Sequence, residues 1–486
     1  MESLEKIRQT RLEKLEKIRK LGINPFPAKS AKKQDVATCL KSAGKIVQTA
    51  GRVMAIRGHG GSSFMDLVDE SGKIQLFFSA DKLSTINRQL LTLLDTGDFI
   101  QVEGKVDKTA AGQLTIFADG FKLLTKSIRP VPATFYGLKN PETRLRKRYL
   151  DLIANPEVHD LFVKKAKFWT SVRQFLIEDG FLEVETPALE LIPGGADATP
   201  FITHHNALDA DYYLRISLEL YQKRLLVGGF EKIFEIGKIL RNEGIDTEHL
   251  QDYLQMEFYW AYADYVALID FVEKYYRFIV KETFGSTKTK SGEIELDWGK
   301  PWEKVDYIDA FKVETGLDLS KNPKVDELLK LADKVGAKPN KKLAEGRLID
   351  LIYKKTIRPK LIQPSLLINH PVAVSPLAKR DEKNPNIVQR IQVLAAGTEI
   401  GNGWSELNDP IDQAQRFEKQ QEMRKEGDTE AQMYDHDFVE ALEYGMPPAA
   451  GFGLSQRLFA VLVDKPIRET VFFPTIRGEN ETITLR

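Results

Sequence analysis

Polar and apolar side chains alternate along the segment YLQMEFYW, residues 253–260. In a β-strand, side chains two residues apart lie on the same face. One face of this predicted strand carries Tyr253, Gln255, Glu257 and Tyr259. The other face carries Leu254, Met256, Phe258 and Trp260, and is typical of a core-facing surface. The polar face predicts that the strand lines either water or a polar pocket.

The segment just upstream, Glu231–Arg241, also reads as a strand, so the two segments predict a β-hairpin. Groups that can form hydrogen bonds are dense around its loop, Asn242–Asp252, and include Arg241, Glu243, His249 and Asp252. A bare connection needs fewer such groups. The loop is therefore a candidate binding loop, although a solvated loop also fits the pattern.

A carboxylate and an indole come close together in TEIGNGWSELND, residues 398–409. Asn402, Trp404 and Glu406 share one face at a period of two residues. A carboxylate beside an indole can bind an ammonium group through an ion pair and a cation–π contact. A tight turn with exposed acids fits equally well, and spacing alone does not decide between the two.

An arginine follows a segment rich in proline and glycine, GMPPAAGFGLSQR, residues 445–457. The pattern predicts a strand that leads into a helix carrying Arg457. Such an arginine could hold a triphosphate, or it could be a surface residue. The sequence contains no Gly-x-x-x-x-Gly-Lys-Ser/Thr loop and no Gly-x-Gly-x-x-Gly turn, so P-loop and dinucleotide-binding sites find no support.

Residues 31–135 read as β structure. Five short runs rich in Val, Ile, Leu and Phe are separated by turn signals: Lys45–Ile56, Ser63–Asp69, Lys73–Phe78, Phe99–Val106 and Leu114–Leu124. They predict a small barrel, and the OB-fold is the commonest such barrel that binds oligonucleotides. Phe64, Phe77 and Phe78 could stack on bases, with Arg52 and Arg57 near phosphates. Each Phe taken alone fits the barrel core better.

The rest of the chain mixes helices and strands. Glu157–Asp179 predicts one long helix with an apolar stripe and Gly180 as its stop. Residues 302–362 are mostly helical in pattern and resemble an insertion. From residue 364 strands and helices alternate again, and they end in the strand-like Val471–Phe473. The whole pattern predicts the α+β class.

Composition narrows the functional classes. Lys+Arg and Asp+Glu are both 70 in 486 residues, so binding to nucleic acid must depend on local basic patches. The single cysteine, Cys39, excludes an internal disulfide and a cysteine-based zinc site. No apolar run approaches the roughly 18 residues of a membrane span, and we expect a cytoplasmic protein. The amphipathic helix predicted within residues 1–30 could pack on its own domain or contact RNA phosphates.

Taken in order, these segments resemble the class II lysyl-tRNA synthetases of the bacterial type, from about residue 40 to the C-terminus. The stretches that support the resemblance are AGRVMAIRGHGGSSFMDLVDESGKIQLFF, FLEVETPAL (motif 1), PFITHHNALDADYYLRISLELYQKRLLVGGFEKIFEIGKILRNEG (leading into motif 2), HPVAVSPLAKR, EIGNGWSELNDPIDQAQRF and MPPAAGFGLSQR (motif 3). Class II motifs alone indicate only the class, whereas THHNALD and GNGWSELND are typical of the lysine enzymes.

The resemblance implies a domain organisation and a reaction. Residues 1–30 would be a helical extension, 31–135 an OB-fold that reads the anticodon, and 136–486 a catalytic domain. That domain would hold an antiparallel sheet flanked by helices, with a helical insertion at about 302–362. The protein would form a homodimer, partly through motif 1. It would use ATP and Mg²⁺ to activate lysine and would load it onto tRNA(Lys).

The resemblance also assigns residues to the nucleotide. Arg241 would contact the α-phosphate and the lysine carboxylate, and Glu243 the adenine amino group. His249 would approach the phosphates, and Tyr253 would stack under adenine where the family usually has Phe. Arg457 would lie at the γ-phosphate end, which makes Arg241 and Arg457 the expected catalytic pair. Glu399 and Gln392 would hold the metal.

For lysine, the resemblance implies that Gly195, Glu219 and Glu257 hold the α-amino group and that Asn402 meets the carboxylate. Tyr259 and Glu406, beside Trp404, would bind the ε-ammonium. A partly buried Glu406 left unpaired by a shorter or uncharged side chain should cost several kcal/mol and so select lysine. The predicted anticodon contacts are Arg57, Phe64 and Gln75.

Several acidic positions of the family pattern are neutral here: Ala373, Gln392, Gln456 and, in the barrel, Gln113. An amide oxygen can still bind Mg²⁺, but without charge, so we expect activity with a raised magnesium requirement. Two alternatives remain open, a lysyl-transferring paralogue that modifies a protein and an inactive RNA-binding paralogue. The barrel argues against the first, and the retained Arg241, Glu243, Glu399, Glu406 and Arg457 argue against the second.

Overall fold

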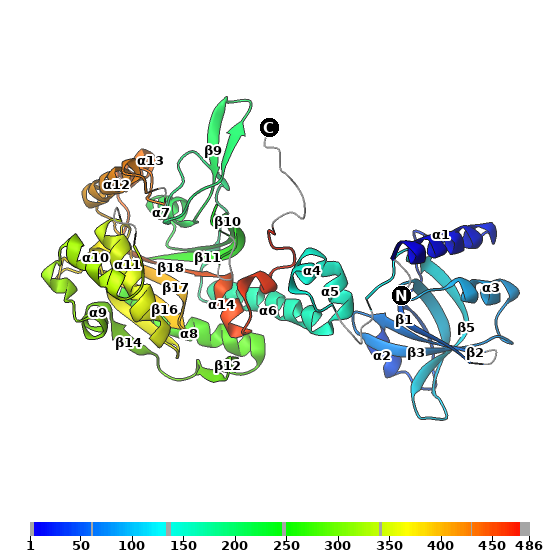
Figure 1. The fold of residues 1–486 in the computed structure, drawn as a ribbon. Helices are drawn as coiled ribbons and strands as arrows, with labels where there is room; N and C mark the ends of the chain where they lie inside the picture. Colours follow the sequence, from blue (N-terminus) through cyan, green and yellow to red (C-terminus); the bar gives the residue numbers. More distant parts are fainter. Residues whose placement is uncertain are drawn as a thin grey trace. The chain divides into compact units, whose positions relative to one another are not determined.

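The structure is a computed structural model that describes residues 4–59, 62–132, 138–244, 249–339, 343–428 and 430–476. The chain divides into two compact units, Met1–Pro156 and Glu157–Arg486, which are blue to cyan and cyan to red in Figure 1. Among the described residues, none of the helices combines the length and the hydropathy needed to cross a bilayer.

Five strands close into a barrel in the N-terminal unit, in the order β1-β2-β3-β5-β4. Their bounds are Ile46–His59 (β1), Ser62–Asp69 (β2), Gly72–Ser79 (β3), Phe99–Lys108 (β4) and Leu114–Thr125 (β5). Alternate side chains of each strand point inward and form one core, as the period-two pattern predicts. The prediction of a five-stranded OB-type barrel is therefore confirmed.

Three helices accompany the barrel: α1 (Leu4–Lys20), α2 (Val36–Leu40) and α3 (Thr85–Leu93). On α1, Leu15 and Ile18 are buried. Arg11 of α1 donates to the carbonyl oxygens of Ser127 and Arg129 at 3.1 and 3.0 Å. The apolar face of the N-terminal helix thus packs on its own domain, and contact of its basic face with RNA stays a prediction. Two short helices follow the barrel, α4 (Pro141–Arg146) and α5 (Arg148–Ala154).

An eight-stranded sheet organises the second unit, in the order β14-β15-β16-β17-β18-β11-β10-β6. Its strands are β6 (Leu182–Glu183), β10 (Lys232–Leu240), β11 (Asp252–Ala261), β14 (Glu303–Asp306), β15 (Ser365–Pro371), β16 (Ile387–Ala395), β17 (Thr398–Ser405) and β18 (Ala449–Ser455). Neighbours from β15 to β10 are antiparallel, as predicted. The outer pairs β14–β15 and β10–β6 are parallel, because the chain returns to these edges through helical segments rather than hairpins.

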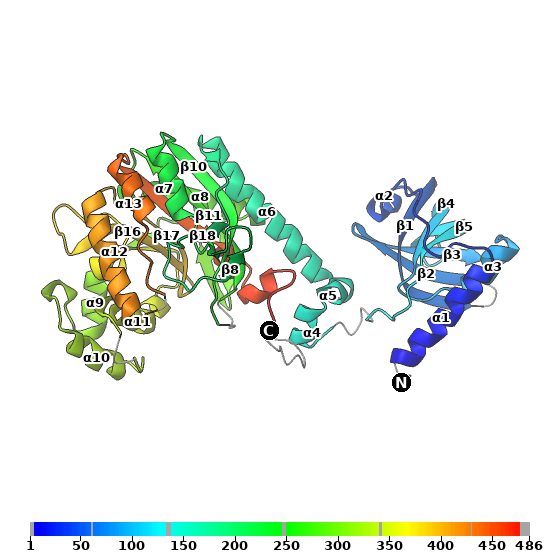
Figure 2. The same cartoon turned by 90° about the horizontal axis from the view of Figure 1, so that it is seen from above.

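Helices α6 (Pro156–Glu178), α8 (Tyr265–Phe284) and α14 (Gln456–Leu462) share the main core with one face of the sheet (Figure 2). Phe168 and Tyr275 from the helices meet Phe258 and Phe452 from the strands in that core. The opposite face of β11 carries Tyr259 into a separate cluster, formed with α7 (Glu219–Val227), α12 (Pro410–Lys425) and α13 (His436–Glu443). Helices α6, α8 and α14 therefore cover one face of the sheet, and a binding site can form only on the opposite face, the one that carries Tyr259.

The region of the predicted insertion, residues 302–362, is mostly helical where the structure describes it. It contains α9 (Tyr307–Thr315), α10 (Val325–Lys334) and α11 (Glu345–Thr356), and these helices have their own core around Phe311, Leu328 and Ile352. A three-stranded sheet joins β7 (Leu189–Glu190), β8 (Ile202–His205) and β9 (Ala210–Leu214), and a hairpin joins β12 (Lys288–Ser291) to β13 (Ile294–Asp297). Short 3₁₀ turns lie at Leu319–Lys321, Arg358–Lys360, Val372–Val374 and Ile467–Thr470.

The strand predicted at Val471–Phe473 is wrong, because the segment has no strand pairing in the structure. The ring of Phe472 instead stacks on Phe162 of α6, with 3.7 Å between ring centroids. The carbonyl oxygen of Thr470 accepts from the side chains of Lys165 at 2.8 Å and Gln456 at 3.0 Å. Side chains therefore replace a neighbouring strand as partners at the start of this apolar run.

Candidate active site

A cavity of about 910 Å³ opens on the face of the sheet opposite α6, α8 and α14. It brings together every residue predicted to bind lysine, nucleotide or metal: Gly195, Glu219, Arg241, Glu243, His249, Tyr253, Glu257, Tyr259, Gln392, Glu399, Asn402, Trp404, Glu406 and Arg457. These residues come from the β10–β11 hairpin, from β16, from β17 and the residue after it, from the start of α14 and from the segments around α7. Their convergence from distant parts of the chain makes this cavity the candidate active site.

One end of the cavity is formed by six residues that the sequence predicts to bind lysine: Gly195, Glu219, Glu257, Tyr259, Trp404 and Glu406. It is called the lysine end after that prediction. Glu257 is 4% exposed and accepts four hydrogen bonds there. Its Oε1 accepts from the Ser217 hydroxyl at 2.9 Å, from the Leu218 amide at 3.2 Å and from the Gln255 amide nitrogen. Its Oε2 accepts from the Tyr259 hydroxyl at 2.9 Å. These bonds fix the position of the carboxylate.

Glu406 is 1% exposed, and the structure shows polar partners for one of its two carboxylate oxygens among the described residues. Its Oε2 accepts from the Trp404 indole at 2.8 Å and forms an ion pair with Lys223. Its Oε1 is buried without a hydrogen-bond partner in the part of the chain that the structure describes. Burial raises the pKa of Glu406 to about 7, although Lys223 and Trp404 act in the opposite direction. An unpaired buried carboxylate oxygen is costly and fits a cationic ligand.

Glu219 and Lys223 lie one turn apart on α7, and both are buried. The Lys223 ammonium forms ion pairs with both Glu219 and Glu406. Burial raises the pKa of Glu219 to about 8 against the effect of Lys223. Burial lowers the pKa of Lys223, but the two carboxylates outweigh it and the net shift is upward. Sequence reasoning missed Lys223, because a charged residue on a short helix usually faces solvent.

Gly195 cannot be replaced without strain. Its φ of +84° lies in the left-handed region, and an added Cβ would come within 2.8 Å of the Ser217 hydroxyl and 2.9 Å of Glu219 Cβ. Its amide donates a long bond of 3.4 Å to the Gln432 side chain. The backbone can therefore run directly beside Glu219 at the lysine end.

Arg390 orients Asn402 and was also missed. Its Nε donates to Asn402 Oδ1 at 2.9 Å, and its guanidinium lies 5.7 Å from the centre of the Trp404 ring. Because the amide oxygen of Asn402 accepts this bond, the amide nitrogen remains as the donor that a carboxylate needs. The alternation of β16, which places Arg390 and Gln392 on one polar face, was the available signal.

Around the other end of the cavity, Arg241 and Tyr253 stand at the base of the hairpin loop. The Arg241 guanidinium lies 5.8 Å from the Tyr253 ring centre and donates to the Ile216 carbonyl at 3.1 Å. The buried Gln251 donates to the carbonyl oxygens of Gly244 and Glu243 at 2.9 and 3.3 Å. Gln251 thus ties the two arms of the loop together. Residues 245–248 of the predicted loop lie outside the described residues.

The two predicted metal ligands lie on neighbouring antiparallel strands, β16 and β17. Glu399 faces the cavity with its charge, whereas Gln392 accepts a hydrogen bond from the Tyr353 hydroxyl at 2.8 Å on Oε1. Among the described residues, no group of three or more His, Cys, Asp or Glu could hold a metal. Mg²⁺ is often bound by one or two carboxylates plus substrate phosphates. The residues therefore fit a Mg²⁺ whose remaining ligands come from a nucleotide.

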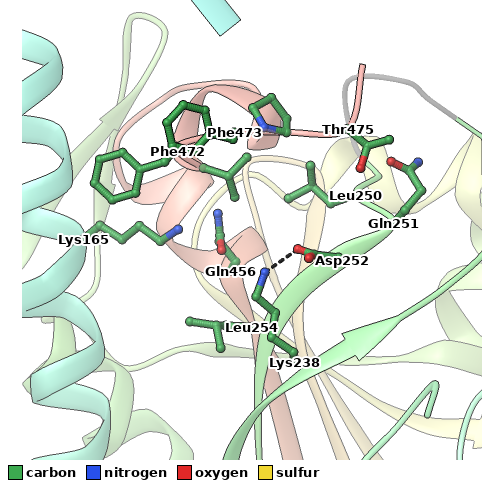
Figure 3. Close-up of a pocket in the computed structure, with 12 residues that line it drawn as sticks. Lys165, Lys238, Leu250, Gln251, Asp252, Leu254, Gln456, Phe472, Phe473 and Thr475 are labelled. Atoms are coloured by element: carbon green, nitrogen blue, oxygen red, sulfur yellow. Dashed lines mark hydrogen bonds and ion pairs between the residues drawn. The ribbon is translucent and has the colours of Figure 1, made fainter. Parts of the chain in front are cut away.

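A second cavity of about 280 Å³ lies on the other side of Leu250 and is drawn in Figure 3. Lys165, Lys238, Asp252 and Gln456 line it, and burial lowers the pKa of Lys165 to about 8. Gln456 donates to Thr470 Oγ1 at 2.9 Å. Since Gln456 lines this smaller cavity and bonds to the chain there, we assign it a structural role.

In the barrel, Phe78 is buried in the core. Phe64, Phe77 and Phe117 instead form a half-buried row on its outside, with ring centroids 4.9 and 5.4 Å apart. Gln75 lies on β3, the same strand as Phe77, and its Oε1 accepts a hydrogen bond from the Thr115 hydroxyl at 2.9 Å. Arg57 pairs with Asp66 at 2.5 Å. The aromatic row is available for stacking on bases.

Two family models match this chain, one in each of its two parts. Residues 140–477 match the model of the family described as tRNA synthetases class II (D, K and N), and residues 47–124 match that of an OB-fold nucleic acid binding domain. The chain is 44% identical over 477 residues to the lysine–tRNA ligase of Moorella thermoacetica, covering 97% of this chain and 98% of that one. It is 41% identical over 487 residues to the lysine–tRNA ligase of Thermoanaerobacter pseudethanolicus, with 99% and 98% covered. The enzyme of Halalkalibacterium halodurans is 42% identical over 488 residues, with 98% and 97% covered.

Proposed function

Because the chain belongs to the lysine–tRNA ligases, class II synthetases that activate lysine with ATP and load it onto tRNA, we propose a role in that reaction for each predicted residue of the cavity. The observation that supports these roles best is the buried Glu406, whose Oε1 has no hydrogen-bond partner among the described residues. A cationic ligand tip removes the cost of burying that oxygen. The ε-ammonium of lysine supplies such a tip.

At the lysine end, Glu406 Oε1 accepts from the ε-ammonium, and Tyr259 and Trp404 close the site around it. The α-ammonium is held by Glu219, Glu257 and the backbone of Gly195. Asn402, oriented by Arg390, donates to the lysine carboxylate. An amino acid without a terminal cation leaves Glu406 unpaired, and this is the basis of selection.

The activation step needs no protein base, because the lysine carboxylate is already ionised. One carboxylate oxygen forms a bond to the α-phosphorus of ATP, and the bond to the departing pyrophosphate breaks. Arg241 neutralises charge at the α-phosphate, and Arg457 does so at the γ-phosphate end. His249 approaches the phosphates, Tyr253 stacks under adenine, and Glu243 accepts from its amino group. Catalysis is therefore positioning together with charge stabilisation.

Mg²⁺ is proposed as the cofactor, held by Glu399 and the nucleotide, with Gln392 as a neutral neighbour. When bound, it would neutralise phosphate charge. Since the Gln392 oxygen already accepts from Tyr353, its contribution to metal binding is weak. Glu399 then carries most of the protein's attraction for the ion.

Replacing Gln392 with glutamate is expected to lower the Mg²⁺ concentration that gives half-maximal pyrophosphate exchange by about three- to tenfold, because a second carboxylate joins Glu399. The measurement is a magnesium titration at fixed ATP. The Tyr353→Phe variant is the control for loss of the hydrogen bond alone. A variant with the magnesium dependence of the wild type would count against the assignment.

For tRNA, we propose that the barrel of residues 31–135 reads the anticodon through Arg57, Phe64 and Gln75, with Phe77 and Phe117 extending the stacking surface. The catalytic domain of residues 136–486 and the helical extension of residues 1–30 complete the proposed organisation. Transfer to a protein and an inactive RNA-binding role gain no support, since the chain has the barrel and retains Arg241 and Arg457.

A homodimer is proposed through the segment that resembles motif 1. Leu182 and Leu189 of this segment are exposed, as is Leu191 just after it. Ile202 is exposed in the sheet that contains Leu189. Apolar side chains gathered in this way are typical of a protein interface. We place the protein in the cytoplasm, where charged tRNA is used for translation.

The test is pyrophosphate exchange measured with lysine, asparagine and aspartate side by side. The proposed function predicts exchange with lysine alone, and equal exchange with asparagine or aspartate would refute it. Aminoacylation of tRNA(Lys) then tests the barrel. Phe64→Ala should weaken tRNA charging while leaving pyrophosphate exchange intact, whereas an unchanged charging rate would remove Phe64 from the anticodon site.

A further inference from the structure

Lys223 is a fully buried cation that the reaction described above does not use. Its side chain has 0% exposure, and its ammonium pairs with Glu219 and Glu406. The Phe438 ring lies 6.0 Å from the ammonium on another side. Within the described residues, Lys223 does not line the cavity, whereas both of its carboxylate partners do. The ammonium therefore lies behind the two carboxylates and leaves the ligand's place free.

The charges at the lysine end correspond to those of the ligand. Its described residues include three buried carboxylates, those of Glu219, Glu257 and Glu406. When two bound ammonium groups keep all three carboxylates ionised, these carboxylates and Lys223 together carry two net negative charges. Free lysine brings two ammonium groups to this end, while its carboxylate is directed to Asn402 and Arg241. The buried charges of protein and ligand then cancel, and burial of charge is tolerated when it is paired in this way.

Without Lys223, three carboxylates would share one desolvated space. Like charges at such distances raise one another's pKa, so at least one carboxyl group would hold its proton to a higher pH than it does beside Lys223. Glu219 and Glu406 are the candidates, because they lose their counter-ion, whereas Glu257 keeps four hydrogen bonds. A protonated Glu406 could not pair with an ε-ammonium.

We propose that Lys223 is a positioning residue for lysine selection: its ammonium holds Glu219 and Glu406 in place from behind and leaves a net charge that matches the two ammonium groups of the substrate. Glu219, Glu257 and the Tyr259 hydroxyl are the titratable groups that face Glu406 along with Lys223. Trp404 fixes the same Glu406 oxygen that Lys223 does, so the other oxygen is directed to the ligand. The inference rests on the proposed function.

The first test compares Lys223→Met with wild type in pyrophosphate exchange and in direct lysine binding at pH 7. The loss of the counter-ion is expected to raise KM and Kd for lysine by about 30-fold, with KM for ATP changed less than about twofold. The control is Lys232→Met, which removes a β10 lysine whose ammonium pairs with Asp179 at 2.9 Å. The control should behave like wild type.

The pH profile separates charge balance from simple structural support. In Lys223→Met, the pH above which the lysine Kd levels off should move upward by about one unit, because the crowded carboxyl group holds its proton longer. The double variant Lys223→Met, Glu219→Gln again has two net negative charges and should return the profile toward wild type. Lys223→Arg, which keeps the charge, should recover part of the lysine affinity.

Three results would overturn the proposal. The first is a lysine Kd within about threefold of wild type in Lys223→Met. The second is a parallel rise of KM for lysine and ATP with no shift in the pH profile, which would indicate a structural role. The third applies if Lys223→Met does not fold. In that case the proposal fails if the pH profile of the double variant Lys223→Met, Glu219→Gln remains shifted from that of the wild type. If the wild type failed to exchange pyrophosphate with lysine, the proposed function would be refuted instead. The lysine binding measurements do not depend on exchange, so the two failures can be told apart.

Discussion

Replacing Glu406 with glutamine should lower kcat/KM for lysine in pyrophosphate exchange by on the order of 10²–10³-fold. The amide has no charge for the ε-ammonium, and its NH₂ group faces either that cation or Lys223. Removing one partner of a buried, hydrogen-bonded charge pair costs about 2–5 kcal/mol, which corresponds to this loss. KM for ATP should stay close to the wild-type value, because the loss is confined to the lysine end.

The same variant tests amino-acid choice. Norleucine, which has the lysine chain length without the cation, should gain relative to lysine in Glu406→Gln. The control is Glu443→Gln, since Glu443 is exposed at the end of α13. If Glu406→Gln left the preference of lysine over norleucine untouched, Glu406 would not be the residue that reads the ε-ammonium.

Adding one methyl group at Gly451 should damage the lysine end nearly as much. A Cβ built on Gly451 would overlap Glu406 Oε1 and come within 2.5 Å of Tyr259 Cε1. Both side chains are buried, so they cannot move aside without strain. Gly451→Ala is therefore expected to raise KM for lysine by about 100-fold and to lower stability by about 1–3 kcal/mol. Exchange kinetics and thermal unfolding measure the two effects.

Gly453→Ala is the matched control for that variant. Gly453 lies two residues further along β18, and a Cβ there would meet Glu257 Cγ at 3.4 Å, which is an ordinary contact. KM for lysine should therefore change little. Equal damage from both variants would mean that the strand, rather than the fit around Glu406, sets lysine affinity.

The sequence was sufficient to predict the barrel strands and the β10–β11 hairpin, because both follow a period of two residues. It also predicted that Tyr253, Glu257 and Tyr259 share one polar face. Tyr259 and Glu257 line the cavity, whereas Phe258 between them lies in the core. The residues predicted to bind lysine, nucleotide and metal came from family motifs, and the structure brings them to one cavity. Their individual roles stay predictions.

Other features could not be predicted because they depend on what lies across space. Lys223 reads as a surface residue on its helix, and only the fold places it behind Glu219 and Glu406. Gln251 lies within the predicted loop, and only the structure shows that it ties the two arms of that loop together. Val471–Phe473 has strand-like composition, but α6 offers Phe472 a ring to stack on instead of a strand to pair with.

The affinity for lysine should depend on the ionisation of Glu406. The measurement is the lysine Kd from pH 6 to 8, by calorimetry without ATP, in wild type and Glu406→Gln. Burial raises the pKa of Glu406 to about 7 in the free protein. A bound ammonium favours the ionised carboxylate and lowers this pKa, so binding releases a proton below about pH 7 and affinity rises with pH. We predict that the wild-type Kd falls by about tenfold across this range from Glu406 alone, and that the variant loses this part of the slope. A wild-type Kd that does not vary with pH, or that is lower at pH 6, would contradict the proposal that the buried Glu406 carboxylate binds the lysine side chain.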